Sequence, residues 1–171
     1  MSFEKLLQIG KTGESLISTF FKKKGYSILP VYELINQEFK GPQVFSNSGN
    51  FIAPDMIIFK KKKSIWIECK YKTAFSWYRK KQIWTTGIDK KCFLDYCKIA
   101  ELSPFPVWIF FLQMGGTAKD SPKSDSGLFA QKTDILKDNI DHESNNWAKG
   151  MIYWNKDLLI KIASIDMLKD K

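Results

Sequence analysis

A continuous apolar run from Pro106 to Leu112 places the tightest constraint on how this chain folds. Successive side chains of a strand point to opposite faces of a sheet, so a strand that is apolar at every position must be covered on both faces. The run therefore predicts an internal strand of a covered sheet. With 171 residues, the chain is expected to form one domain, residues 1–171, whose core needs neither disulfides nor a structural metal.

Other segments predict the elements around this strand. Apolar residues and glycines at helical spacing between Leu6 and Phe21 predict a helix, which Lys22–Lys24 and Gly25 would terminate. A second helix, with Ile88 on its apolar stripe, would begin at Asp89 or Thr86 and end before Pro104. The remaining expectations are strands at 26–35, 55–59, 64–69 and 151–154, loops at 36–50 and 114–126, a last helix at 156–168, and no assignment for 128–147. The order α-β-β-β-α-β predicts an α/β (α+β) domain around a central mixed sheet.

The charge of the chain points to a polyanionic partner. Lysine and arginine outnumber aspartate and glutamate by 27 to 18, and the formal net charge is +9. Nucleic acid is the first candidate and an acidic membrane the second. Because Arg79 is the single arginine, we expect this charge to contact phosphates and not to read bases. A membrane-surface protein is disfavoured, since no predicted helix pairs a lysine face with a strongly apolar face.

The cysteines and the hydropathy pattern exclude several other classes of protein. Cys69, Cys92 and Cys97 have no zinc-ligand spacing, and His142 is the single histidine, so a Cys/His metal site is not expected. The N-terminal stretch lacks a signal-peptide core, and no apolar run approaches the length needed to span a bilayer. We therefore expect a soluble, reduced, cytoplasmic protein.

One hairpin carries the residues with the clearest chemical potential. The strands at 55–59 and 64–69 flank Lys60–Lys63, which predicts a tight turn with a basic tip. Alternation along the second strand places Glu68 and Lys70 on the same face. A tight turn would bring Asp55, which opens the first strand, to within a residue or two of the position opposite Glu68. Two carboxylates and an ammonium group would then meet at one end of the sheet.

This grouping suits a magnesium-dependent hydrolase. Magnesium prefers oxygen ligands and is typically held by one or two carboxylates, waters and substrate phosphates. Taken alone, however, Glu68-Cys69-Lys70 is better explained as a solvated ion pair at the end of an edge strand, which contributes little to stability. Glu14 changes this balance, because it lies at the border of the first helix's buried stripe, where a carboxylate needs a partner. Gly10 and Gly13 on that face predict close approach by another segment, although an exposed Glu14 is an equally good interpretation.

With Gly13-Glu14, Pro54-Asp55 and Glu68-Cys69-Lys70 in this order, the chain resembles the PD-(D/E)xK nuclease superfamily. The likeness covers residues 8 to 112 and is greatest to small archaeal Holliday-junction-resolvase-like and phage-type members. It implies a restriction-endonuclease-like core in which Asp55, Glu68 and the Cys69 carbonyl bind the metal, Lys70 positions the water, and Glu14 completes the acidic cluster. Ser48 stands where resolvases have a functional serine. Ser15 departs from the resemblance, because resolvases commonly have arginine after the helix glutamate.

The segment after Lys70 mixes cations with aromatic rings and is the candidate nucleic-acid contact. Such residues can bind phosphates and stack on bases. Alternatively, Phe75 and Trp84 belong to the core and the lysines are simply solvated. His142, among polar residues far from any motif, is given no catalytic role. The candidate contacts are Ser48, Lys72, Trp77, Tyr78, Arg79, Lys80 and Lys81.

The sequence therefore predicts a metal-dependent endonuclease that hydrolyses DNA phosphodiester bonds, with a structure-selective, Holliday-junction-resolvase-like activity as its narrower form. Mg²⁺ is the expected cofactor, and Mn²⁺ is expected to substitute for it. The alternative is a catalytically inactive nucleic-acid-binding protein with a nuclease-like fold. A homodimer is also expected, since cutting a duplex requires two strand cleavages. Its contact surface would be the region around Phe105–Phe111 or the last helix.

Overall fold

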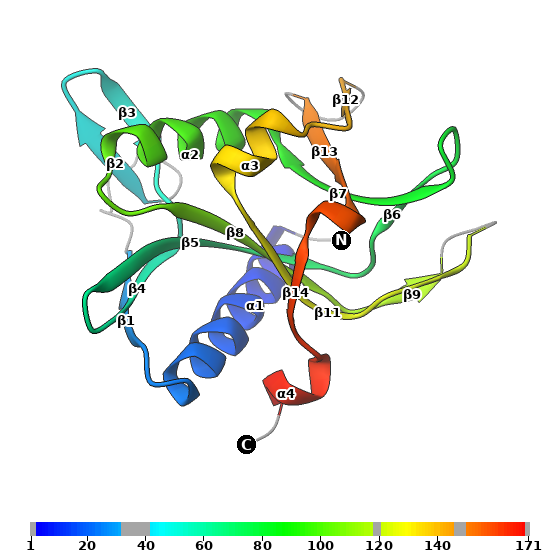
Figure 1. Ribbon diagram of the computed structural model, residues 1–171, viewed down its shortest axis with the longest axis horizontal. Helices are drawn as coiled ribbons and strands as arrows, with labels where there is room; N and C mark the ends of the chain where they lie inside the picture. Colours follow the sequence, from blue (N-terminus) through cyan, green and yellow to red (C-terminus); the bar gives the residue numbers. More distant parts are fainter. Residues whose placement is uncertain (1–2, 32–41, 118–120, 146–149, 170–171) are drawn as a thin grey trace.

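A six-stranded mixed sheet runs through the computed structural model, which describes residues 3–31, 42–117, 121–145 and 150–169 (Figure 1). Its neighbouring strands are antiparallel except for β5 and β8, which run parallel. In their spatial order, the strands are β1 (Ser27–Pro30), β4 (Met56–Lys60), β5 (Lys63–Lys72), β8 (Val107–Gln113), β11 (Gly127–Lys132) and β14 (Ile160–Ala163). The mixed sheet predicted from the sequence is confirmed.

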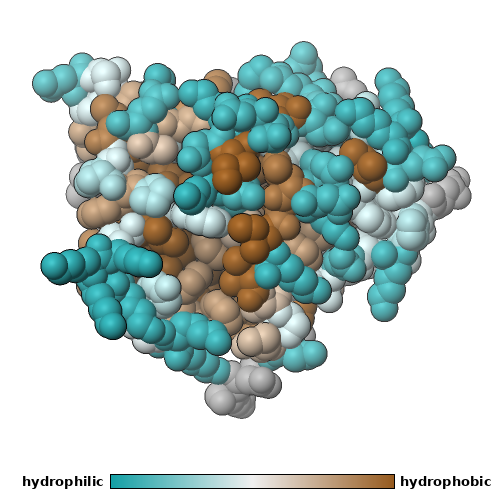
Figure 2. All heavy atoms as spheres, viewed as in Figure 1, coloured by the Kyte–Doolittle hydropathy of each residue, from teal (hydrophilic) through white to brown (hydrophobic). Residues whose placement is uncertain are grey.

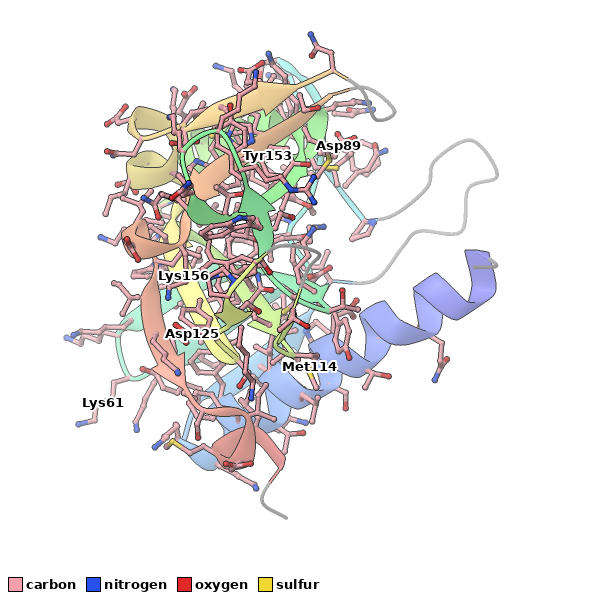
Figure 3. The ribbon with its side chains drawn as sticks, turned by 90° about the vertical axis from the view of Figure 1, so that its right-hand side faces the viewer. Lys61, Asp89, Met114, Asp125, Tyr153 and Lys156 are labelled. Atoms are coloured by element: carbon pink, nitrogen blue, oxygen red, sulfur yellow. The ribbon has the colours of Figure 1, made fainter. Side chains whose placement is uncertain are left out.

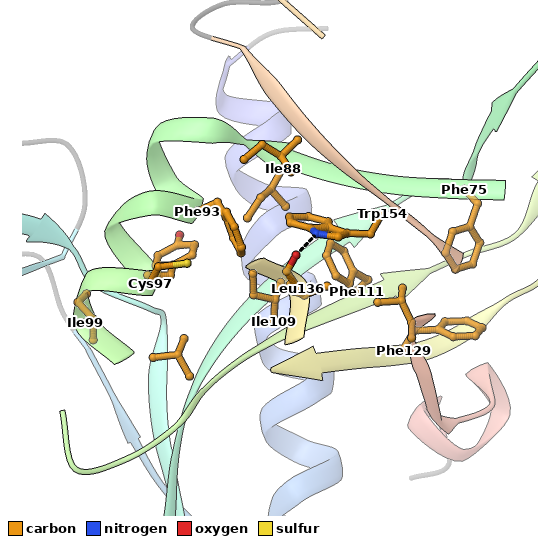
Figure 4. Packing of buried hydrophobic residues seen from close by; sticks show 14 residues of the cluster. Phe75, Ile88, Phe93, Cys97, Ile99, Ile109, Phe111, Phe129, Leu136 and Trp154 are labelled. Carbon is orange, nitrogen blue, oxygen red and sulfur yellow. Dashed lines mark hydrogen bonds between the residues drawn. The ribbon is translucent and has the colours of Figure 1, made fainter. Parts of the chain in front are cut away.

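The apolar run forms β8, an internal strand that is buried on both faces. Ile109 and Phe111 point into a core under the helices α2 (Lys90–Leu102) and α3 (Thr133–Asp138), which also contains Trp154 (Figure 4). Phe110 and Leu112 point to the other face, into a second core covered by α1 (Phe3–Lys23). The alternation between two cores explains why no position of this strand is polar until Gln113.

A second, four-stranded sheet packs over the α2 side of the first. Its order is β12 (His142–Ser144), β13 (Met151–Asn155), β7 (Ile83–Asp89) and β6 (Ser76–Tyr78). The Trp154 indole donates a hydrogen bond to the Leu136 carbonyl at 2.8 Å (Figure 4), and the Gln113 amide donates to the Thr86 hydroxyl at 3.1 Å. Because β6 and β7 follow β5 directly in the chain, this sheet lies beside the end of β5.

The two long helices begin and end close to the predicted positions. Gly25, with φ of +79°, follows the end of α1 in the left-handed conformation that glycine adopts most readily. Asp89 caps α2, since its Oδ1 accepts hydrogen bonds from the amides of Lys91 and Cys92. This confirms Asp89 as one of the two predicted starts of the helix, whereas Thr86 and Ile88 belong to β7 and not to the helix.

Three predicted segments are partly or wholly wrong. The end of the 36–50 loop is a hairpin of β2 (Gln43–Ser46) and β3 (Gly49–Ile52), while 36–41 and part of the strand predicted at 26–35 lie outside the described residues. Within the 114–126 loop, β9 (Gly116–Thr117) pairs with β10 (Lys123–Ser124). The helix predicted at 156–168 is η1 (Lys156–Leu158), the edge strand β14 and the short helix α4 (Ile165–Lys169).

Among the helices of the described segments, none is both long and apolar enough to cross a membrane.

The two glycines of α1 differ in their surroundings. A Cβ added at Gly13 would lie 3.2 Å from the Cβ of Tyr71 on β5, so the expected close approach is real there. A Cβ added at Gly10 would meet nothing within 4 Å, so the same expectation is wrong for Gly10. Gly13 therefore allows α1 to pack tightly on the strand that carries Glu68 and Lys70.

This difference predicts opposite responses to alanine. Gly10→Ala should stabilise the protein by about 0.5–1 kcal/mol, because alanine has the higher helix propensity and the site is open. Gly13→Ala should not stabilise the protein and should destabilise it by up to about 2 kcal/mol, because the Cβ of Tyr71 cannot move away from the added methyl group. Denaturant unfolding of both variants measures the difference. Equal stabilisation by both substitutions would show that Gly13 is not needed for packing.

Candidate active site

The β4–β5 hairpin brings Asp55 and Glu68 together. Its register pairs Met56 with Ile67, so the next position places Asp55 opposite Glu68. The Asp55 Oδ2 atom accepts a hydrogen bond of 2.7 Å from the amide of Cys69. The tight turn lies at Lys61, whose φ of 57° is left-handed. This confirms the prediction that Asp55 lies within a residue or two of the position opposite Glu68.

Glu68 lies in the interior with one oxygen paired and the other unpaired. Its side chain is 3% exposed, and its Oε1 atom forms an ion pair of 2.5 Å with the Lys70 ammonium. Its Oε2 atom is buried without a hydrogen-bond partner among the described residues. Because β5 lies between β4 and β8, this is neither an edge strand nor a solvated ion pair. The interpretation of the Glu68-Cys69-Lys70 motif as a solvated ion pair at the end of an edge strand is therefore wrong.

Glu14 approaches this pair from α1. Its side chain is half-buried, and its pKa is raised by burial and by the charge of Glu68, while Lys11 and Lys70 act in the opposite direction. The interpretation of Glu14 as a fully exposed helix charge does not hold. Three carboxylates from α1, from the residue before β4 and from β5 thus influence one another electrostatically.

The acidic cluster is electrostatically unfavourable by itself. Burial and then the Glu68 charge raise the pKa of Asp55 well above its usual range. Lys70 keeps its proton, because the Glu68 carboxylate outweighs the opposing effect of burial and raises the pKa of Lys70. In the described part of the chain, no three His, Cys, Asp or Glu side chains form a ready-made metal cage. A buried unpaired oxygen beside a second carboxylate nevertheless fits magnesium, which completes its octahedron with waters and substrate oxygens.

Two further side chains border the Glu68 side of the sheet. Tyr96 of α2 is fully buried, and burial together with the Glu68 charge raises its pKa well above the usual range. Lys72 follows Lys70 on the same face, where burial and the Lys70 charge lower its pKa to about 8. Sequence analysis placed Tyr96 only on the apolar stripe of α2, because the contact depends on how α2 packs across the sheet.

The other predicted contact residues lie apart from this cluster. Ser48 is in the exposed β2–β3 turn, at the tip of a projecting hairpin (Figure 1), where its hydroxyl pairs with that of Ser46 at 2.9 Å. Trp77 packs edge-on against Trp84, with ring centroids 5.0 Å apart, and Phe75 is buried in the core. The alternative that aromatic residues of this segment belong to the core is therefore correct for Phe75. Packing within the protein also explains one contact of Trp77.

Tyr78 lies in an aromatic stack on the outer face of the second sheet. The His142 ring stacks on Tyr78 at 4.1 Å and on Tyr153 at 4.6 Å between centroids. Tyr153 is labelled in Figure 3. Lys80 lines the adjoining groove, and Arg79 is exposed. Lys81, by contrast, forms an ion pair of 2.8 Å with Asp141. Sequence reasoning missed this stack, because it joins β6 to strands that lie far away in the chain, β12 and β13.

Comparison with known proteins identifies the architecture. No family model and no curated protein sequence matches the chain. Among solved structures, the chain is similar to Hjc, a Holliday junction resolvase from the archaeal hyperthermophile Archaeoglobus fulgidus, with a TM-score of 0.55 and 10% sequence identity. The similarity covers 90% of this chain and 97% of the resolvase chain. The chain has a restriction-endonuclease-like fold. At this identity the likeness establishes the nuclease-like fold alone.

The raised pKa of Asp55 predicts how stability depends on pH. The folded protein holds the Asp55 proton more tightly than the unfolded chain, so stability is lost as the pH rises from the usual aspartate range through the raised pKa. Asp55→Asn avoids this loss and can still accept the Cys69 hydrogen bond. In chelator at pH 8, the variant should melt at a higher temperature, by about 2–4 °C for each kcal/mol recovered.

The advantage of Asp55→Asn should shrink as the pH falls toward 4, where about half of the aspartate is already protonated in the unfolded chain. Asp138→Asn, at an exposed carboxylate of α3, is the matched control and should change the melting temperature much less. Thermal unfolding from pH 4 to pH 8 measures both. A constant difference across this range would show that the Asp55 charge does not strain the fold.

Proposed function

We propose that this protein is a metal-dependent endonuclease that hydrolyses phosphodiester bonds of DNA. The observation that carries the proposal is the buried Glu68 carboxylate, which has one oxygen on Lys70 and the other without a partner, directly opposite Asp55. A buried, unpaired carboxylate oxygen is costly unless a ligand satisfies it. The nuclease-like fold and the net charge of +9 support nucleic acid as the substrate.

In this proposal, Asp55, Glu68 and the Cys69 carbonyl would hold Mg²⁺, and Glu14 would add charge at the rim. A bound Mg²⁺ or Mn²⁺ lowers the pKa of its water and offsets negative charge on the phosphodiester. The Lys70 ammonium, fixed by Glu68, would orient the attacking water or a phosphate oxygen. The amide of Cys69 holds Asp55 in place, so the carboxylate needs little reorganisation to bind a cation.

Branched DNA is the narrower substrate that we propose, because the similar structure is that of a Holliday junction resolvase. Arg79 and Lys80 remain candidate phosphate contacts, while Lys81 would first have to leave Asp141. The homodimer expected for cutting both strands stays a prediction, but the region around Phe105–Phe111 is wrong as its contact surface, because most of this run is buried in the internal strand β8. An inactive DNA-binding protein with this fold is the alternative, and it differs from the nuclease in a single observable, strand cleavage.

The proposal predicts cleavage that depends on Mg²⁺ or Mn²⁺ and stops with chelator. Glu68→Gln and Lys70→Ala should each lower the rate by at least about 100-fold, since one disables the metal ligand and the other removes the group that orients the water. The measurement is single-turnover cleavage of labelled duplex, four-way junction and single-stranded DNA.

A surface ion pair supplies the matched control. Lys90 and Glu143 are also 2.5 Å apart, but both side chains are about 40% exposed. Glu143→Gln and Lys90→Ala should each leave cleavage within about twofold of wild type, because solvated ion pairs contribute little. Equal losses in the control and site variants, or DNA binding without metal-dependent cleavage, would rule the nuclease out and favour the inactive binding protein.

A further inference from the structure

Seven exposed lysines meet at one end of the molecule, where α1 stops and the β4–β5 hairpin turns. We call them the lysine cluster: Lys22, Lys23, Lys24, Lys60, Lys61, Lys62 and Lys63. The Lys60 ammonium joins the two segments, because it donates a hydrogen bond of 2.6 Å to the Lys24 carbonyl and lies 5.4 Å from the centroid of the Tyr26 ring. The hydrophilic lower left of Figure 2 corresponds to this end of the fold in Figure 1.

The surroundings of the lysine cluster do little to neutralise it. The sequence contains no Asp or Glu between Glu14 and Glu33, or between Asp55 and Glu68. The α4 helix packs against α1 and carries the exposed carboxylate of Asp166. Within the described residues of α4 and of the two lysine segments, this is one carboxylate against seven ammonium groups in the lysine cluster, so the local charge is strongly positive. Lysines held this close repel one another, so a polyanion that binds here is stabilised by relief of that repulsion.

The exposed face of α1 connects this cluster to the candidate active site. In Figure 3, α1 runs diagonally from the upper right toward the end of the molecule where Lys61 is labelled. Lys11 lies at the other end of this face, close enough to Glu14 to lower its pKa. Between Lys11 and Lys22 the exposed residues are Thr12, Ser15 and Thr19. Short uncharged side chains allow a nucleic-acid backbone to come close to the helix.

The length of this face matches several nucleotides. At about 1.5 Å per helical residue, Lys22 lies roughly 16 Å from Lys11 along the axis. Phosphates of one DNA strand are spaced by about 3.4 Å along the duplex axis, so the distance corresponds to roughly five of them. On the sheet, Lys63 lies roughly 17 Å from Glu68 along β5. Both routes place the lysine cluster several base pairs away from a bond held at Glu68.

We propose that the exposed face of α1 and the lysine cluster form a track that holds the phosphate backbone of one duplex DNA arm leading away from the candidate active site. The claim that the track leads to an active site rests on the proposed function. The claim that the track binds duplex DNA does not. The exposed residues of the α1 face are polar, which disfavours insertion into a membrane. Contacts to phosphates alone carry no sequence information, so the track would fix the direction of the arm without selecting its sequence.

A charge-matched pair of variants tests the track by DNA binding in chelator, where no strand is cut. The track variant replaces Lys22, Lys24, Lys62 and Lys63 with glutamine. The control variant replaces Lys98, Lys123, Lys137 and Lys161 with glutamine, removing the same charge from other parts of the described surface. A third variant with arginine at the four track positions keeps the charge. Fluorescence anisotropy with a 20-base-pair duplex, at several salt concentrations, gives the affinity and its salt slope.

The track variant should bind the duplex about 10- to 100-fold more weakly at 0.1 M salt, with a salt slope smaller by about two to four. The control variant should lose less than about threefold, and the arginine variant should bind like wild type. Equal losses in the track and control variants would overturn the proposal, as would an unchanged affinity in the track variant. Loss in the arginine variant would also overturn it, because the charge would then not explain binding.

The same variants separate this proposal from the proposed function. Duplex binding that is lost in the track variant, in a protein that cuts no DNA with Mg²⁺, would support the track and contradict the nuclease. Metal-dependent cleavage together with equal binding by the track and control variants would contradict the track alone. Anionic vesicles of phosphatidylglycerol and phosphatidylcholine provide the comparison ligand. If the track variant loses vesicle binding while its duplex binding is unchanged, the surface binds lipid and the proposal is wrong.

Discussion

The register of the β4–β5 hairpin is the constraint on which the candidate site depends. A strand has a side-chain period of two, so a slip of one residue would turn Glu68 and Lys70 to the opposite face and move Asp55 away from its partner. The tight turn at Lys61, the apolar residues facing the two cores and the hydrogen bond from the Cys69 amide to Asp55 all specify the same register. Local packing therefore fixes the chemistry of this site.

This arrangement places charge where the fold alone cannot stabilise it. Asp55 and Glu68 face each other in the interior, and Lys70 neutralises only one of the four carboxylate oxygens by a direct ion pair. Sites that bind cations often show raised carboxylate pKa values when the cation is absent, because the charges repel one another. The tight packing of α1 at Gly13 brings a third carboxylate, Glu14, toward the same place. A divalent cation would resolve the repulsion among all three.

Much of the core fold could be predicted because its signals are local. The uninterrupted apolar run of β8, the hairpin around Lys61 and the cap of α2 by Asp89 each depend on a few neighbouring residues. The electrostatic state of the site could not be predicted, because the burial of Glu68 depends on β8 and α2 packing around β5. From the sequence alone, the Glu68-Cys69-Lys70 motif was better explained as a solvated surface pair.

The parts that were missed depend on contacts distant in sequence. The segment 156–168, predicted as a helix, contains a short apolar run that fits a helix or a strand, and its pairing with β11 decides for the strand β14. Likewise, the second sheet joins strands near Trp77 with strands near His142, so no local pattern reveals the stack of Tyr78, His142 and Tyr153. The β2–β3 hairpin was obscured by its four-residue strands, which are too short to show clear alternation.

The central claim is that the facing carboxylates of Asp55 and Glu68 bind a divalent cation. Anomalous diffraction from crystals of the protein grown with Mn²⁺ tests it most directly. We predict a single strong peak about 2.1–2.3 Å from the unpaired Oε2 of Glu68, with Asp55 in the same coordination shell, and no such peak in crystals of Glu68→Gln. An Mn²⁺-loaded crystal that shows no peak at this position, or shows the ion bound only elsewhere, would contradict the account.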